Sequence, residues 1–240
     1  FPGRHPLFLG MLGLHGAKYA NLAVTDCDCL IAVGARFDNR VVAKVRGFAP
    51  KAKIIHIDID PAEIGKNVRV NVPIVGDVKQ VLQALLPLIE KKDGTEWLER
   101  VRELKEKYPL QYQPDGTLKP QYIVEKLDEL TGGDAVVVTD VGQHQMWAAQ
   151  FYRLNKSRYF VSSGGLGTMG YGLPAAVGAQ LGAPDKTVIL VTGDGSFQMT
   201  MQELGTIAEQ QLPIKIFVFN NQRLGMVRQL QSFFCDSRFS

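Results

Sequence analysis

Short runs rich in Val and Ile alternate along this chain with segments whose apolar residues recur at helical spacing. Continuous apolar runs of this length are typical of strands buried on both faces, and alternation with helices predicts parallel sheets covered by helices. The pattern therefore predicts an α/β fold. The expected strands are Cys29–Val33, Ile54–Ile59, Ala135–Thr139, Val188–Thr192 and Ile216–Asn220, and the expected helices are Val78–Glu90, Pro120–Leu130, Tyr171–Leu181 and Gln202–Gln210.

A polar stretch separates these elements into two groups. Residues 90–117 are rich in Lys, Glu, Asp and Gln, contain Pro114-Asp115-Gly116, and carry a polar helix expected from Glu96 to Lys107. Such a composition is typical of a connection between domains. We therefore expect two Rossmann-like parallel-sheet units, both truncated, at residues 1–90 and 118–240, joined by a connection at 91–117.

Composition and charge argue against several classes of protein. A net charge of +3 with no block of like charge predicts no nucleic-acid-binding surface. No apolar run approaches the roughly 20 residues that span a bilayer, so no membrane segment is expected. The chain begins at Phe1 without a signal-peptide pattern, and we expect it to start inside a longer protein.

Three cysteines bear on the cellular compartment. Cys27 and Cys29 are too close in sequence for an ordinary disulfide, and Cys235 leaves an odd number. We interpret them as reduced thiols of a cytoplasmic protein, with a metal or redox pair as the alternative.

Two polar motifs follow neighbouring apolar runs. Gly193-Asp194-Gly195 follows the run ending at Thr192, and Asn220-Asn221 follows the next run, with 24 residues between Gly195 and Asn220. In an open parallel sheet the carboxyl ends of the strands face the ligand crevice. A carboxylate, an amide oxygen and a nearby backbone carbonyl suit Mg²⁺ or Ca²⁺ better than zinc. Each motif read alone is more simply an ordinary turn or strand end.

Together the two motifs resemble the signature of thiamine-diphosphate enzymes. The resemblance implies that Mg²⁺ is coordinated by Asp194, by the side chain of Asn221 and by the backbone carbonyl of Arg223. It also implies a diphosphate lined by backbone amides, a use of such donors that favours anions. The residues expected to supply them are Gly195, Ser196, Leu224 and Gly225.

Further segments resemble one branch of these enzymes, acetohydroxyacid synthase. Gly142-Gln143-His144 is similar to its diphosphate-contacting loop, and the glycine-rich segment Ser163–Pro174 is similar to its cofactor loop, with Gly165 against the cofactor. The resemblance implies that Met169 is the apolar wedge that bends the cofactor and that Met226 faces the substrate. Leu230 stands where most members carry Trp, which leaves acceptor preference and inhibitor sensitivity open.

The first unit resembles the FAD-binding middle domain of the same family. The resemblance rests on Leu12–Gly16, Gly34–Arg40 and Ile55–Pro61. Arginines are suited to pyrophosphate, although middle domains of related enzymes keep the fold after losing the flavin. The residues implied as FAD contacts are His15, Gly34, Ala35, Arg36, Asp38, Arg40, Asp58, Asp77 and Val78.

The resemblance implies decarboxylation of pyruvate and carboligation to pyruvate or 2-oxobutyrate, as in branched-chain amino-acid biosynthesis. It also implies a homodimer or larger assembly with a small regulatory subunit. The family's catalytic Glu lies on a domain that this sequence does not match, so we expect the 240-residue chain to bind cofactor poorly alone. The alternatives are glyoxylate carboligase, pyruvate oxidase or another carboligating relative, or a scaffold that keeps the fold without chemistry.

Overall fold

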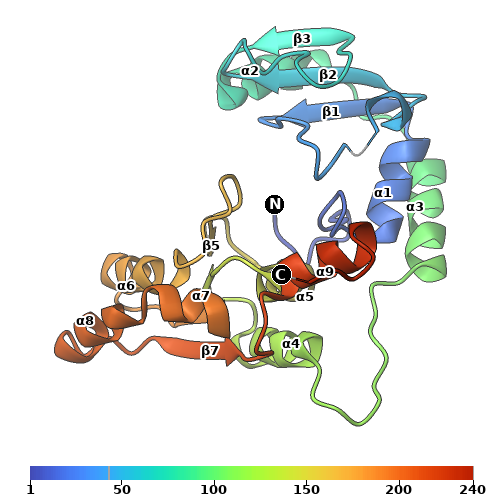
Figure 1. Cartoon of the computed structure of the whole chain (residues 1–240). Coiled ribbons are helices and arrows are strands. Elements are labelled where there is room, and N and C mark those ends of the chain that lie inside the picture. Colours follow the sequence, from blue (N-terminus) through green and yellow to red (C-terminus); the bar gives the residue numbers. More distant parts are fainter. Residues whose placement is uncertain (43, 240) are drawn as a thin grey trace. The chain divides into compact units, whose positions relative to one another are not determined.

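The computed structural model describes residues 1–42 and 44–239, and these form two compact units. One unit comprises Leu9–Gln111, and the other comprises Phe1–Phe8 with Tyr112–Ser240. Each unit contains one parallel sheet with helices (Figure 1), which confirms the predicted α/β class.

The unit formed by Leu9–Gln111 has a three-stranded parallel sheet in the order β1-β2-β3. Its core gathers around Phe37, Ile54 and Val68. The strands are β1 (Cys29–Val33), β2 (Lys53–Asp58) and β3 (Val72–Val75), and the helices are α1 (Lys18–Asp26), α2 (Val78–Leu85) and α3 (Thr95–Lys107), with short 3-10 turns η1 (Val45–Gly47) and η2 (Leu86–Leu88).

Two helices of this unit show how local sequence sets their bounds. The side chain of Asp77 caps α2 by accepting from the Gln80 amide at 3.1 Å. The helix ends at Leu85, earlier than expected, because a 3-10 turn containing Pro87 follows it. The polar helix expected near Glu96 forms as α3, where Arg100 pairs with Asp26 of α1 at 2.9 Å.

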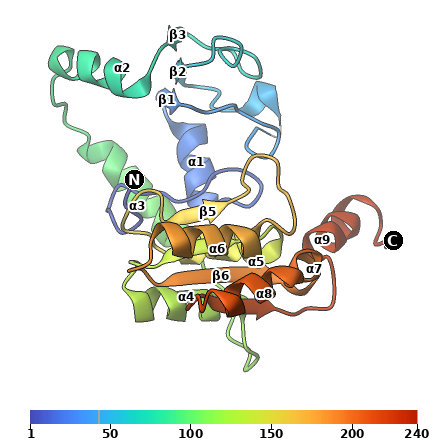
Figure 2. The same ribbon diagram turned by 90° about the vertical axis from the view of Figure 1, so that its left-hand side faces the viewer.

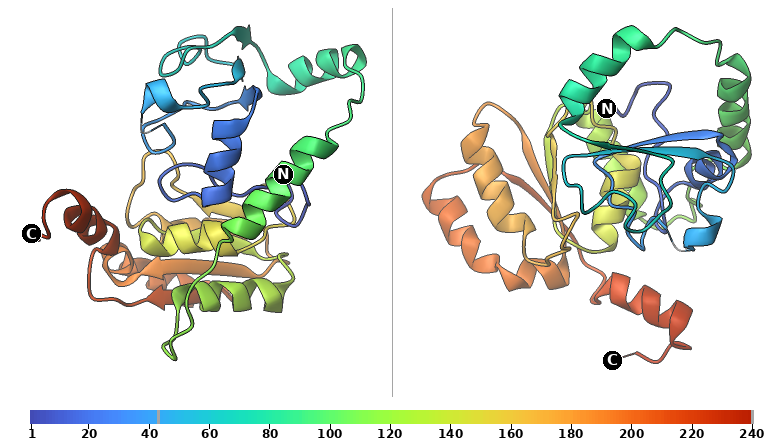
Figure 3. Two further views of the ribbon diagram at one scale, coloured as in Figure 1. Left: turned by 90° about the vertical axis from the view of Figure 1, so that its right-hand side faces the viewer. Right: turned by 90° about the horizontal axis from the view of Figure 1, so that it is seen from above.

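The other unit is built on a four-stranded parallel sheet in the order β5-β4-β6-β7. Every residue of β4 and β6 is buried, as expected for strands covered on both faces. Figures 2 and 3 show α4 and α5 on one face of this sheet and α6 on the other. The elements are α4 (Pro120–Thr131), β4 (Val136–Thr139), α5 (Gln143–Phe151), β5 (Phe160–Ser162), α6 (Gly172–Gly182), β6 (Val188–Gly193), α7 (Asp194–Met199), η3 (Met201–Glu203), α8 (Leu204–Glu209), β7 (Lys215–Phe219) and α9 (Gly225–Phe234).

Capping residues and apolar packing explain this unit. Pro120 occupies the first turn of α4, where its missing N–H is not needed, and Gly132 ends the helix with a φ of +60°. Val138 and Leu190 of the central strands are fully buried and pack with Leu173 of α6.

Several boundaries differ from expectation. The helix expected at Gln202–Gln210 begins as the 3-10 turn η3 and continues as the short α8. The strands β3 and β5 were not anticipated because each is only three or four residues long. All three cysteines are free thiols. None of the helices in the described ranges is long and apolar enough to cross a membrane.

Candidate functional site

A pocket of about 170 Å³ opens at the carboxyl ends of β4, β6 and β7. The chain leaves β4 toward β5 on one side and returns to β6 on the other side, so the loops after β4 and β6 part at this edge. Such a switch point is the usual ligand crevice of an open parallel sheet. The pocket therefore lies where the topology favours a binding site.

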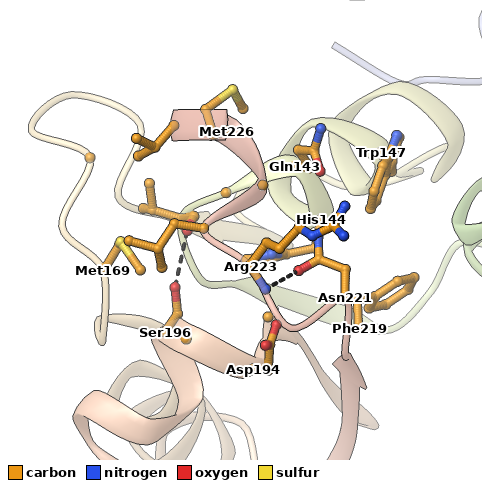
Figure 4. A pocket seen from close by; sticks show the side chains of 18 residues that line it. Gln143, His144, Trp147, Met169, Asp194, Ser196, Phe219, Asn221, Arg223 and Met226 are labelled. Atoms are coloured by element: carbon orange, nitrogen blue, oxygen red, sulfur yellow. Dashed lines mark hydrogen bonds between the residues drawn. The ribbon is translucent and has the colours of Figure 1, made fainter. Parts of the chain in front are cut away.

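Two side chains that carry oxygen atoms, those of Asp194 and Asn221, enter the pocket from the ends of two adjacent strands (Figure 4). Asp194 is the first residue of α7, directly after β6, and Asn221 follows β7. Their strands are hydrogen-bonded neighbours, with Gly193 opposite Phe219 in the register. A carboxylate at a helix start and an amide oxygen beside it form a donor set of the kind that Mg²⁺ accepts.

The loop that carries Asn221 is held by its own side chains. The side-chain oxygen of Asn220 accepts from the Gln222 amide at 3.1 Å, and that of Asn221 accepts from the Arg223 amide at 3.0 Å. Gln222 adopts a φ of +55°, a backbone conformation that residues other than glycine rarely adopt. An amide oxygen has two lone pairs, so Asn221 keeps one for a cation. The turn brings the Arg223 backbone to the same rim.

The described residues contain no cluster of three or more His, Cys, Asp or Glu side chains that could hold a metal ion. The predicted Mg²⁺ set has a different composition, in which one carboxylate acts with an amide oxygen and a backbone carbonyl. A zinc-type site is therefore not indicated in this part of the chain.

His144 lies in the first turn of α5 and faces the pocket. Burial lowers the pKa of its imidazole to about 4, although the carboxylates of Asp140 and Asp194 and a hydrogen bond to the Asp140 backbone act in the opposite direction. The ring is neutral at neutral pH. Its Nε2 is buried without a hydrogen-bond partner in the structure, which leaves a polar atom for a ligand to satisfy.

Three glycines let neighbouring side chains pack closely against the backbone at the floor of the pocket. A Cβ at Gly193 would lie 2.9 Å from His144 Nδ1, and one at Gly195 would lie 2.7 Å from Leu224 Cδ2. A Cβ at Gly225 would lie 2.2 Å from Gln143 Oε1. Each distance is far below an ordinary contact, so side chains can meet here only because these residues are glycine.

The remaining walls are mostly apolar. Figure 4 shows Met169 and Met226 on one part of the wall and Trp147 with Phe219 on another. On the pocket floor, Ser196 donates its hydroxyl to the Val141 carbonyl at 3.1 Å and ties α7 to the loop after β4. An apolar cavity with a few convergent polar groups is typical of a small-molecule site.

The structure brings together nearly all residues that the sequence placed at a cofactor and metal site. Gly165 lies outside the pocket lining, in the exposed part of the glycine-rich loop. The pocket is lined by the predicted residues Gly142, Gln143, His144, Met169, Asp194, Gly195, Ser196, Asn221, Arg223, Leu224, Gly225 and Met226, and by Val141, Trp147, Gly167, Gly193, Phe219 and Val227, which were not singled out. Gly167 and Gly193 belong to motifs named in the sequence, and the others lie close to such motifs, so proximity in sequence was the available signal.

The residues expected to contact FAD all belong to the unit Leu9–Gln111. Gly34, with a φ of +59°, directly follows β1, Asp58 ends β2, and Asp77 follows β3 at the start of α2. The three strands are parallel neighbours, so these residues share one edge of the sheet. That edge is again the carboxyl end, where ligands bind in such sheets.

Charged side chains accompany this edge. Asp38 accepts from the Arg40 amide at 2.9 Å, and its carboxylate lies 3.7 Å from the Arg36 guanidinium. Both arginines are exposed. Burial and, secondarily, the charge of Arg40 lower the pKa of His15. The turn therefore presents two cations with a neutral imidazole near Arg40, an arrangement that suits a pyrophosphate.

Comparison with known proteins decides the family. The family model named thiamine pyrophosphate enzyme, central domain, matches residues 1–85. The family model named thiamine pyrophosphate enzyme, C-terminal TPP binding domain, matches residues 140–240. The chain is 52% identical to the probable acetolactate synthase large subunit of Methanocaldococcus jannaschii, over 100% of this chain and 42% of that protein. The chain belongs to the acetolactate synthase family of thiamine pyrophosphate enzymes.

Other members of the family are equally similar. Identity is 51% to acetolactate synthase 1, chloroplastic, of Nicotiana tabacum, over 98% of this chain and 36% of that protein. Identity is 52% to the acetolactate synthase large subunit of Corynebacterium glutamicum, over 100% of this chain and 40% of that protein. The chain thus spans about two-fifths of the length of the relatives it matches. Thiamine diphosphate is the cofactor of this family, and Mg²⁺ and FAD are typical of it.

Proposed function

We propose that this chain supplies the cofactor-binding part of an acetolactate synthase, which decarboxylates pyruvate and joins the two-carbon unit to a second 2-keto acid. The observation that carries the proposal is the meeting of Asp194, Asn221 and the unpartnered His144 Nε2 at the carboxyl ends of adjacent strands. That combination suits a site for a cation with an anionic ligand.

The donor set fits Mg²⁺ and a diphosphate. Asp194, the Asn221 side chain and the Arg223 backbone carbonyl would hold the cation. His144 and Gln143 would bind the diphosphate together with backbone amides at the start of α7 and of α9, because helix starts favour anions. The missing side chains at Gly195 and Gly225 let Leu224 and Gln143 lie close to the backbone at this end of the pocket.

When bound, thiamine diphosphate supplies the electron sink that carbon dioxide loss from a 2-keto acid requires. The chain's own residues bind it, orient it and exclude water. Met169 and Met226 line the pocket beside the polar floor, and we propose that Met169 supports the cofactor while Met226 faces the substrate. An apolar wall strengthens the electrostatic interactions at the polar end of the site.

The edge of the β1-β2-β3 sheet is proposed as the FAD site. Support comes from Arg36 and Arg40 beside Gly34 at the end of β1, with Asp58 and Asp77 at the ends of the neighbouring strands. The arginines would pair with the pyrophosphate, and Asp58 would lie near the ribose.

Assembly and compartment are proposed on the same basis. We propose a homodimer or larger assembly that works with a small regulatory subunit, since relatives are named large subunits. The free state of Cys27, Cys29 and Cys235 supports a reducing compartment such as the cytoplasm, although relatives from Nicotiana tabacum are named chloroplastic.

Product analysis with the full-length protein tests the function. Incubation with pyruvate, thiamine diphosphate, Mg²⁺ and FAD is expected to release 2-acetolactate, and added 2-oxobutyrate to give 2-aceto-2-hydroxybutyrate. Acetate or acetyl phosphate as the product would instead favour a pyruvate oxidase, and turnover of glyoxylate alone would favour a glyoxylate carboligase. Absence of Mg²⁺-dependent cofactor binding would refute the proposal.

A further inference from the structure

Asp140 is a fully buried carboxylate beside His144 to which the site described above assigns no contact with a ligand. It directly follows β4, its exposed fraction is 0%, and it is not among the residues that line the pocket. A buried charge is costly unless hydrogen bonds compensate it. This one accepts three, from the backbone amides of Val141 at 2.8 Å, Gly170 at 2.9 Å and Gly172 at 3.1 Å.

Through these three bonds one carboxylate holds two loops that are distant in sequence. Val141 begins the loop toward Gln143, whereas Gly170 and Gly172 end the glycine-rich loop about 30 residues later. The Gly170 carbonyl is held as well, because Thr200 donates its hydroxyl to it at 3.1 Å. Gly170 is thus fixed from both sides, through its N–H by Asp140 and through its C=O by Thr200.

The approach is so close that the loop needs glycines. Gly170 has a φ of +84°, and a Cβ on it would lie 3.1 Å from Met199 Cβ. A Cβ on Gly172 would lie 2.9 Å from the Asp140 backbone nitrogen and 2.9 Å from Leu190 Cδ1. The glycines therefore let the Asp140 carboxylate reach the backbone on either side of Tyr171.

Met169 immediately precedes this clamped segment. Its side chain lines the pocket, and its Cε would lie 3.9 Å from a Cβ placed on Gly195. Met has three rotatable side-chain bonds and adapts its shape easily, so its own packing does not hold it. The position of Met169 in the pocket consequently depends on the backbone that Asp140 and Thr200 hold.

We propose that Asp140 is a positioning residue that acts through Met169, and that Thr200 completes the clamp from the opposite side of Gly170. This inference rests on the proposed function, because it assigns Asp140 the task of keeping Met169 against bound thiamine diphosphate. If the Asp140 carboxylate were purely structural, replacing it would change the stability of the protein only. If it is a positioning group, replacing it also changes the geometry of the bound cofactor.

Two variants of the full-length protein test the clamp. In Asp140→Asn the side chain keeps one acceptor oxygen and presents an NH₂ group to a backbone N–H, so at least one of the three bonds is lost. Thr200→Val removes only the hydroxyl. Asp128→Asn is the matched control, since Asp128 is also buried and accepts from a backbone amide, but its partners are Arg4 and Arg153 and not the glycine-rich loop.

The decisive measurement is hydrogen–deuterium exchange at C2 of bound thiamine diphosphate, followed by NMR at saturating cofactor, with the dissociation constant and melting temperature recorded alongside. We expect Asp140→Asn to slow exchange roughly 10- to 100-fold, the scale of a misplacement near 1 Å, and Thr200→Val to slow it less but in the same direction. Asp128→Asn is expected to exchange like the wild type.

The outcomes separate the clamp from the proposed function. A wild-type protein that neither binds thiamine diphosphate nor exchanges its C2 proton overturns both. A wild-type protein that does both, with exchange within twofold in Asp140→Asn and Thr200→Val, overturns the clamp alone. If Asp140→Asn does not fold, Thr200→Val decides: unchanged exchange overturns the clamp, and slowed exchange supports it.

Discussion

Replacing Gly225 with Ala separates the demands of the fold from those of the site. Gly225 is the first residue of α9, and Ala is the better helix former by up to about 1 kcal/mol. Helix propensity alone therefore predicts a slightly more stable protein. The site predicts a loss of function in the same variant.

The loss follows from two distances. The new Cβ would lie 2.2 Å from Gln143 Oε1 and 2.8 Å from Asn221 Nδ2, whereas ordinary contacts begin at 3.4 Å. Both atoms end flexible side chains, so the fold survives while the side chains move. Gln143 must retreat by more than an ångström and lose its 3.0 Å hydrogen bond to Gln229. Losing one or two hydrogen bonds to the ligands corresponds to about 10- to 100-fold weaker cofactor binding.

The assay is a titration of the full-length protein with thiamine diphosphate at fixed Mg²⁺, read from the fluorescence of Trp147 in the pocket, together with thermal unfolding. Gly178→Ala is the matched control, because Gly178 lies within α6 with open space around it. We expect the control to bind normally and to unfold at the same or a higher temperature. If Gly225→Ala binds within twofold of the wild type, the steric argument is wrong.

Three further predictions concern the metal, pH and the core. Asp194→Ala is expected to abolish the gain in cofactor affinity that Mg²⁺ gives. The control Asp185→Ala, in the exposed turn before β6, is expected to keep that gain. If Asp194→Ala also keeps the gain, Asp194 is not a ligand of the cation. Burial lowers the pKa of His144 from 6.5 to about 4, so the unfolded state takes up a proton before the folded state as pH falls. His144 therefore contributes up to about 3 kcal/mol to the free energy of unfolding, and this contribution is fully present above pH 6.5 and lost toward pH 4. Urea unfolding of His144→Gln and wild type across that window checks this, and equal pH dependence in both would contradict it. Leu190→Ala, at a fully buried position of β6, is expected to lower the free energy of unfolding by about 2–5 kcal/mol. Leu181→Ala, at a position 59% exposed, should cost less than about 0.5 kcal/mol, and similar losses in urea unfolding would place the core elsewhere.

Much of the fold could be predicted because its signals are local. The apolar run at Val188–Thr192 identified the central strand β6, since a strand buried on both faces needs a continuous apolar sequence. The run at Cys29–Val33 also forms a strand, but β1 lies at the edge of its sheet and only Ala32 in it is buried, so the expectation of burial was wrong there. The short β3 and β5 lacked such a run. These two segments are strands because they pair with β2 and β4, and that pairing cannot be recognised from their own few residues.

The candidate site divides in the same way. Asp194, Asn221 and Gly225 lie in short motifs whose spacing could be read directly, because the carboxyl ends of parallel strands always meet at one edge. Asp140 gave no signal, because a single Asp after a strand looks like any turn residue. Its importance appears only where Gly170 and Gly172 turn their amides toward it.

The sequence by itself determined the α/β class, the family and the residue types at the proposed Mg²⁺ and diphosphate site, since periodicity and motif spacing are properties of neighbouring residues. Only the tertiary structure decided that His144 is buried and neutral, that Gln143 bonds to Gln229, and that Asp140 holds the loop of Met169. Those properties depend on desolvation and on contacts between residues 30 to 86 positions apart, and such contacts exist only once the chain has folded.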